Sequence, residues 1–137
     1  MSVALDTNVL LYAEGANDSR RQRVAIDAIA AIAVGELCIP AQVLAELGHA
    51  LRARAGRSAH EVLHAVQRWS ELARVIPTTT DTVTTAAELA ARHQLQMFDA
   101  IILVAAREAG CDTLMSEDMQ DGFEWSGVRV VDPFGIS

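Results

Sequence analysis

The sequence predicts an α/β fold built around a mainly parallel β-sheet. Short apolar segments with strand character alternate with longer segments of helical periodicity, which is the order in which parallel sheets are assembled. Apolar residues make up 51% of the 137 residues, which favours a globular chain over a disordered one. Aromatic residues are scarce (4%) and alanine is common, which indicates closely packed helices. No repeat, linker or low-complexity segment interrupts the pattern, so we expect one domain over residues 1–137.

Local start and stop signals place the first elements. A short apolar strand, SVAL, ends at Asp6, and Thr7 or Asn8 can cap the helix that continues through VLLYA. After the loop GANDS, Ser19 can cap a second helix of about residues 20–34, which a glycine then ends.

The same signals place the later elements. The strand ELCI comes next, and Pro40 suits the first turn of a helix that runs to about Ala55. Ser58 and Glu61 form a capping-box pattern at the start of a helix that runs to about Arg74. We expect further helices at about residues 80–93 and 97–109, and strands at about residues 74–77, 113–115 and 128–131.

The pentapeptide HEVLH matches the helix of zinc peptidases, in which two histidines bind zinc and a glutamate acts as the base. On a helical wheel, however, His60 and His64 fall on the polar side of their helix. The extended peptidase pattern would need glycine and histidine where this chain has Gln67 and Ser70, and Glu61 is already the capping-box partner. We therefore expect a surface helix here and place a zinc peptidase last among the candidate functions.

The charged residues and the cysteines exclude several other classes of protein. All eleven basic residues are arginine, so the lysine of a P-loop, a receiver domain or a haloacid-dehalogenase-type phosphatase is missing. The net charge of −7 argues against a general nucleic-acid coat. Cys38 and Cys111 lie far apart and outside any CxxC, which is typical of buried thiols in a reducing compartment. Asp6 argues against a signal peptide, and the longest apolar stretch is too short to cross a bilayer, so we expect a cytoplasmic protein without a membrane segment.

Four acidic residues stand in apolar surroundings and carry the functional prediction. Asp6 and Asp118 each follow a strand, and Asp99 lies in the segment MFDAIILVAA, in which every other residue is apolar. A helix that is apolar all round is expected to be buried, so the charge of Asp99 needs a partner. Glu46 borders the apolar face of the helix AQVLAELGHALRARA. Because strand ends and the starts of facing helices meet at one edge of a parallel sheet, we expect the four side chains to converge.

Three of these acids also have a purely structural interpretation, whereas Asp99 alone favours a function. Asp6 or Asp118 alone can equally be the cap of a helix or turn, and Glu46 alone can be an ordinary residue at a helix border. Together the four favour a function, because each close pair of carboxylates costs about 4 kcal/mol at an effective dielectric of about 20. A divalent cation removes that cost, and oxygen ligands suit Mg²⁺ or Mn²⁺. Such a site is suited to metal-assisted hydrolysis of phosphodiesters.

The segments that carry these acids resemble those of PIN-domain proteins, and specifically the VapC type of toxin ribonuclease. LDTNVLLY is similar to the opening strand and first acid of that family, and IPAQVLAELGHALR to its glutamate helix. FDAIILVAA is similar to the segment of the third acid, and LMSEDMQDG with the closing VVDPF to that of the fourth acid and the last strand.

The resemblance implies a three-layer α/β/α sandwich and an endoribonuclease activity that depends on Mg²⁺ or Mn²⁺. It implies a cognate antitoxin, an RNA substrate and a homodimer. It assigns catalysis and metal binding to Asp6, Glu46, Asp99 and Asp118. It further implies that Asn8 and Ser116 orient an acid, a water or a phosphate, with Glu117 and Asp121 as neighbours that can assist or replace Asp118.

Two alternatives stay open from the sequence. Arg52, Arg54 and Arg57 can hold the RNA backbone through its phosphates, or they can belong to an ordinary solvated helix face. The acids can also form a catalytically silent docking surface for a basic partner or RNA. DNA is not excluded as the substrate.

Overall fold

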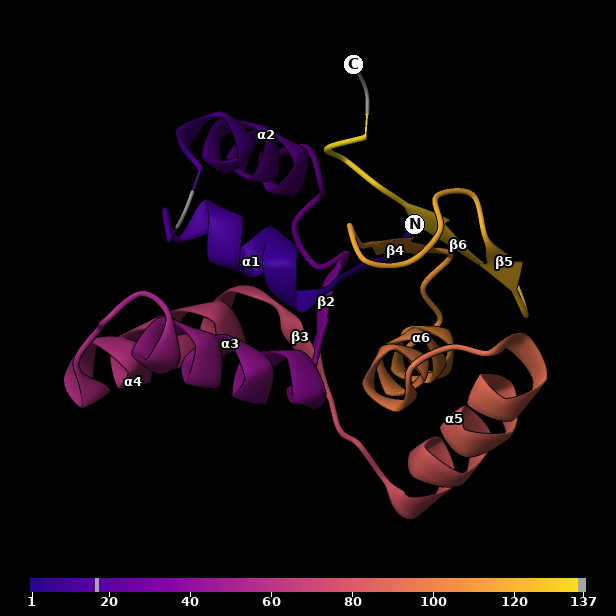
Figure 1. Ribbon diagram of the computed structural model, residues 1–137. Helices are drawn as coiled ribbons and strands as arrows, with labels where there is room; N and C mark the ends of the chain where they lie inside the picture. The colour runs from indigo at the N-terminus through magenta and orange to yellow at the C-terminus, as the bar shows by residue number, and fades with distance from the viewer. Residues whose placement is uncertain (17, 136–137) are drawn as a thin grey trace.

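A six-stranded, mainly parallel sheet forms the centre of the molecule (Figure 1). The computed structural model describes residues 1–16 and 18–135, so Asn17 of the predicted GANDS loop and the last two residues lie outside it. The strands follow the order β3-β2-β1-β4-β6-β5 across the sheet. They are β1 (Val3–Leu5), β2 (Leu37–Pro40), β3 (Arg74–Ile76), β4 (Thr113–Met115), β5 (Glu124–Trp125) and β6 (Val128–Val131). All neighbouring strands run parallel except β5 and β6, which confirms the predicted α/β class.

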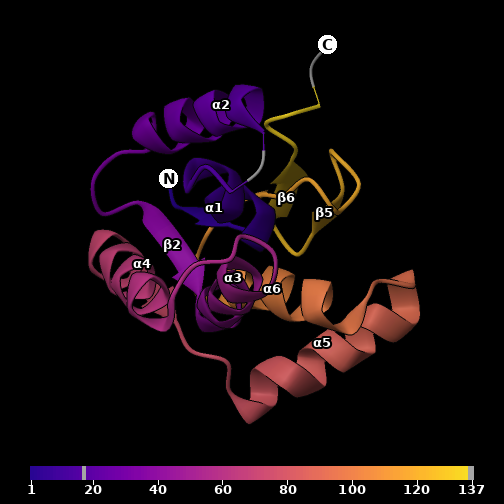
Figure 2. The ribbon, with the colours of Figure 1, turned by 60° about the vertical axis from the view of Figure 1, so that its left-hand side comes forward.

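Six helices in the described part of the chain cover the two faces of this sheet. They are α1 (Thr7–Ala13), α2 (Ser19–Ala30), α3 (Ala41–Ala53), α4 (Ala59–Leu72), α5 (Thr80–His93) and α6 (Met97–Glu108). The chain moves outward from β1 to β3 through α1–α4 and then returns to β4 through α5 and α6. Because such crossovers are right-handed, the return places α5 and α6 on the opposite face from α1–α4, which gives three layers. Both views show α5 lying along α6 (Figures 1 and 2).

The helix α6 is the most deeply buried of the six. Its residues from Ala100 to Ala106 are all buried, and they join the apolar side chains of β1, β2, β4 and β6 in one core. The prediction from the apolar segment is therefore correct for most of α6, but it is wrong for Phe98, whose side chain is 59% exposed. Met97 is half-buried. The first turn of α6 thus emerges from the core at the edge of the sheet.

Several element boundaries differ from the sequence-based expectations. Asp6, rather than Thr7 or Asn8, caps α1, and Asp18, rather than Ser19, caps α2. The helix α2 ends at Ala30 because the following residues turn toward β2, so the predicted end at residue 34 is wrong. The capping box of Ser58 and Glu61 at the start of α4 is confirmed, with a hydrogen bond in each direction. The short strand β5 was not predicted.

One simpler expectation is confirmed. Cys38 and Cys111 are both buried free thiols. None of the helices in residues 1–16 and 18–135 has the length and hydropathy needed to cross a bilayer.

Candidate active site

Two central strands and one helix bring three aspartates together. Asp6 follows β1, Asp118 follows β4, and Asp99 lies in the first turn of α6. The strands β1 and β4 are parallel neighbours with Leu5 opposite Met115, so their carboxyl ends deliver the following residues to the same place. One carboxylate oxygen from each aspartate lies within 4.8 Å of the others. The edge of the sheet at which the sequence places the site is therefore where these acids meet.

Asp6 is the most firmly held member of this cluster. Its side chain is 2% exposed. The backbone N–H of Thr7 donates a hydrogen bond to Oδ1 (2.7 Å), and the Ser116 hydroxyl donates to Oδ2 (2.6 Å). Burial raises the pKa of Asp6 to about 6, in spite of these two hydrogen bonds, which lower it. The charges of Asp99 and Asp118 add to the rise.

The charge of Asp99 is unfavourable in the absence of a cation. Burial raises its pKa, and the nearby carboxylates of Asp118 and Glu46 raise it further. Neither burial nor like charge is offset by an arginine in the part of the chain that the structure describes, since no salt bridge to Asp99 is formed there. A positive ion between the carboxylates would relieve both effects.

Ser116 and Asn8 fix the loop that carries Asp118. The fully buried Ser116 hydroxyl accepts hydrogen bonds from the backbone N–H groups of Asp118 (3.2 Å) and Met119 (3.4 Å) while it donates to Asp6. The Asn8 amide donates to both oxygens of Asp118 at 3.1 Å. The structure thus places both residues beside the acids that they were predicted to orient.

Glu46 lies beside the three aspartates but is not one of the three that meet within 4.8 Å. The Thr7 hydroxyl donates to its Oε1 (2.6 Å), and the Gln42 amide donates to its Oε2 (2.9 Å). Sequence analysis missed these two partners. The position of Gln42 four residues before Glu46 on the same helix is a signal that could have identified it. The role of Thr7 depends on the approach of α1 to α3, which no local pattern reveals.

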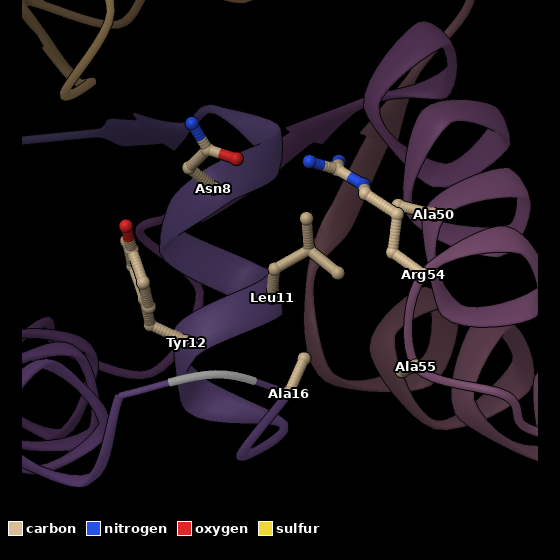
Figure 3. A pocket seen from close by; sticks show the side chains of 7 residues that line it. All are labelled: Asn8, Leu11, Tyr12, Ala16, Ala50, Arg54 and Ala55. Atoms are coloured by element: carbon tan, nitrogen blue, oxygen red, sulfur yellow. The ribbon is translucent and has the colours of Figure 1, made fainter.

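Two of the acids, Glu46 and Asp118, line a cleft of about 550 Å³ between α1, α3 and the first turn of α6. Asn8, Glu46, Arg54, Phe98 and Asp118 are among the residues that line it. A second cavity of about 150 Å³ adjoins it between α1 and α3 and shares Asn8, Ala50 and Arg54. Figure 3 shows the Arg54 side chain reaching from the α3 end of this cavity toward α1. A basic group therefore borders the acidic site.

Two of the predicted assisting acids point to other partners. Glu117 accepts a hydrogen bond from the Tyr12 hydroxyl (3.0 Å) and forms a salt bridge with Arg21 (3.2 Å). Asp121 is exposed, and its Oδ1 accepts a hydrogen bond from the backbone N–H of Asp132. The structure therefore does not bring Asp121 into the three-aspartate cluster, because the loop turns back toward β6 before reaching it.

The predicted arginine group separates into residues with different surroundings. Arg57 donates to the Oε1 and the backbone carbonyl of Glu14, both at 2.6 Å. Trp69 also donates to Glu14, whose side chain is only 10% exposed. Burial alone would raise the pKa of Glu14, but the hydrogen bonds from Arg57 and Trp69 outweigh it and hold the pKa below its ordinary value. Arg57 thus ties the end of α1 to the loop between α3 and α4 instead of facing the cleft.

Replacing Arg57 with alanine should lower the free energy of unfolding by about 1.5–3 kcal/mol, because it leaves the Glu14 carboxylate with weaker partners. The matched control is Arg68→Ala. The Arg68 side chain contacts the same carboxylate but is 61% exposed, so its removal should lower the free energy of unfolding by at most about 1 kcal/mol. Urea denaturation of the three proteins measures the difference. Equal stability of the two variants would contradict the structural role of Arg57.

The chemistry of the donors decides which ion fits this site. The three converging side chains are all carboxylates, and His60 and His64 are both exposed on α4. Carboxylate oxygens suit hard divalent cations such as Mg²⁺ or Mn²⁺ rather than zinc. The residues present therefore fit a magnesium or manganese ion, and the HEVLH segment is a surface helix.

The family model for the PIN domain matches residues 3–123. The chain belongs to the PIN domain family. No protein with a curated description matches the sequence.

Solved structures share the fold of this PIN domain. VapC20 of Mycobacterium tuberculosis, described as a sarcin-ricin loop cleaving toxin, superposes with a TM-score of 0.70 and is 24% identical over 82% of this chain and 87% of its own. A toxin–antitoxin complex from Klebsiella pneumoniae superposes with a TM-score of 0.71 and is 22% identical over 98% of this chain and 100% of its own. FitAcB from Neisseria gonorrhoeae superposes with a TM-score of 0.71 and is 19% identical over 98% of this chain and 99% of its own. At these identities the likeness establishes the three-layer fold.

Proposed function

We propose that this PIN domain is a Mg²⁺- or Mn²⁺-dependent endoribonuclease, and that it is the toxin of a type II toxin–antitoxin pair in the cytoplasm. The observation that carries the proposal is the meeting of Asp6, Asp99 and Asp118 within 4.8 Å of one another, beside a cleft that Asp118 lines. The membership of the PIN family and the fold shared with VapC20 support it.

In this proposal the side chains of the site have different roles in phosphodiester hydrolysis. Asp6, Asp99 and Asp118 hold the cation, directly or through water. When bound, the cation supplies a water of lowered pKa and stabilises charge on the phosphate. Glu46, oriented by Thr7 and Gln42, completes the shell or accepts a hydrogen bond from the attacking water. Asn8 and Ser116 keep Asp118 and Asp6 in place.

The decisive experiment is an RNA cleavage assay of the purified protein with Mg²⁺ or Mn²⁺, repeated with a chelator. We expect internal cleavage with either ion and none with the chelator. A catalytically silent module that docks a basic partner through the same acids would leave RNA intact with either ion. Parallel reactions with DNA determine whether the activity is restricted to RNA.

The proposed partners come from the relatives rather than from the residues. Two of the solved structures contain a toxin with its antitoxin, from Klebsiella pneumoniae and, bound to DNA, from Salmonella typhimurium. We infer that a cognate antitoxin blocks this cleft and that the toxin is a homodimer. Coexpression with the antitoxin and light scattering of the complex test both statements.

Arg54 is the arginine best placed to bind the RNA backbone, because it lines both the acidic cleft and the adjoining cavity. Arg54→Ala should weaken RNA binding and make the plot of log affinity against log salt shallower by about 0.7–1. The matched control is Arg52→Ala, because Arg52 lies in the last turn of α3, two residues before Arg54, and donates to the backbone carbonyl of Arg57. Equal salt slopes for Arg54→Ala and the unmodified protein would remove Arg54 from the interface.

A further inference from the structure

Phe98 is a large apolar side chain that the core of this protein does not use. It lies directly before Asp99 in the first turn of α6, and its side chain is 59% exposed. The residues after Asp99, from Ala100 to Ala106, are buried without exception. Phe98 instead lines the acidic cleft together with Glu46 and Asp118.

The other two phenylalanines differ from Phe98 in their surroundings. Phe134 packs edge to face on Tyr12, with ring centroids 4.9 Å apart, and Phe123 packs in the same way on His93 at 5.5 Å. Within residues 1–16 and 18–135, no aromatic ring stacks on Phe98. Its ring is therefore open to a planar group that enters the cleft.

A nucleobase is a planar group that fits this place. Aromatic side chains beside a backbone-binding groove bind single-stranded nucleic acid by stacking on the bases, whatever their sequence. The cleft combines such a ring with acids that can hold a cation and with Arg54, which directly follows the end of α3, eight residues after Glu46. A paired base cannot offer its face to a side chain unless it first leaves its stack.

We propose that Phe98 stacks on an unpaired base beside the scissile phosphate and thereby directs cleavage to single-stranded RNA. This inference depends on the proposed ribonuclease function. The position of Phe98 next to Asp99, on a helix anchored in the core, fixes the stacked base relative to the acids. Phe98 thus acts on the choice and the position of the substrate, and the acids act on the phosphate.

The test compares Phe98→Ala, Phe98→Leu and Phe98→Trp in cleavage of a single-stranded oligoribonucleotide with Mn²⁺. We expect Phe98→Ala and Phe98→Leu to raise KM by about 5- to 150-fold with little change in kcat, because stacking holds substrate and transition state equally. Phe98→Trp should retain the KM of the unmodified protein. Leu63→Ala is the control, because Leu63 is 49% exposed on α4 and does not line the cleft.

A binding experiment separates this proposal from the proposed function. In an Asp6→Asn background, fluorescence anisotropy measures the affinity for the same oligoribonucleotide and for its blunt duplex. Addition of Phe98→Ala should weaken binding of the single strand by the same factor and leave binding of the duplex unchanged. This binding experiment gives a result even if the unmodified protein cuts no RNA. A lack of cleavage would count against the proposed nuclease function and not against the stacking by Phe98.

Two results would overturn the role of Phe98. One is an unchanged KM and single-strand affinity in Phe98→Ala. The other is an equal loss of affinity for duplex and single strand. If Phe98→Ala instead shifts the protein from dimer to monomer in light scattering without changing either RNA measurement, Phe98 belongs to a protein interface and the stacking proposal is wrong.

Discussion

Replacing Asp99 with asparagine should reduce RNA cleavage by about 100- to 1000-fold, because the change removes a carboxylate that would hold the cation, and the cation would stabilise the charge of the transition state. The shape of the side chain is kept, so the buried helix α6 should pack as before. The same substitution should raise the melting temperature of the metal-free protein, because Asp99 is held near the carboxylates of Asp118 and Glu46 at a cost. Activity and stability are thus expected to change in opposite directions.

The chain supplies a matched control for this experiment in Asp121. It lies in the same motif as Asp118 but outside the cluster, and an asparagine at 121 can still accept the hydrogen bond from Asp132. Asp121→Asn should therefore retain nearly full activity, whereas Asp118→Asn should resemble Asp99→Asn. Single-turnover cleavage assays at saturating Mn²⁺ measure all three. Full activity in Asp99→Asn would eliminate the three-aspartate site as the catalytic centre.

The second large effect is a dependence of stability on pH that comes from Asp6. In the metal-free protein the pKa of Asp6 is about 6, above its ordinary value of 3.8. When folding raises the pKa of a group, the group stabilises the folded protein fully at pH values below its pKa in the unfolded chain. This contribution is lost as the pH rises through its pKa in the folded protein. As the pH rises from roughly 4 to 7, ionisation of Asp6 should therefore lower the free energy of unfolding of the metal-free protein by up to about 3 kcal/mol.

Urea denaturation with chelator at pH 4 and at pH 7.5 gives the free energy of unfolding of the unmodified protein and of Asp6→Asn. The difference between the two proteins measures the contribution of Asp6. Subtraction is needed because other carboxylates, such as Glu14 with its lowered pKa, change stability in the opposite direction. Saturating Mn²⁺ at pH 7.5 should restore the stability of the unmodified protein and leave Asp6→Asn nearly unchanged. Identical pH profiles for the two metal-free proteins would show that Asp6 ionises freely.

The sequence predicts the fold class and the convergence of the aspartates for the same physical reason. Parallel strands end at one edge of the sheet, so acids that follow β1 and β4 meet there whatever lies between them. The two-residue strand β5 is too short to produce an alternating pattern, and it forms only because β6 is available as a partner.

Contacts between helices are the part that the sequence does not predict. The hydrogen bond from Thr7 to Glu46 and the interaction of Arg57 with Glu14 each join residues about 40 positions apart, and their geometry follows from packing. Phe98 was misjudged because the periodicity of MFDAIILVAA gives no sign that its first turn leaves the core. The position of a helix start relative to a sheet edge is a tertiary property.

The hydrogen bond from Ser116 to Asp6 joins residues 110 positions apart along the chain. During synthesis Asp6 leaves the ribosome long before its neighbours from the β4 loop. A nascent chain therefore holds no complete acid cluster until the β4 loop has been translated. If the proposed nuclease activity is correct, the ribosome that makes this protein is not exposed to a working enzyme before that loop has emerged.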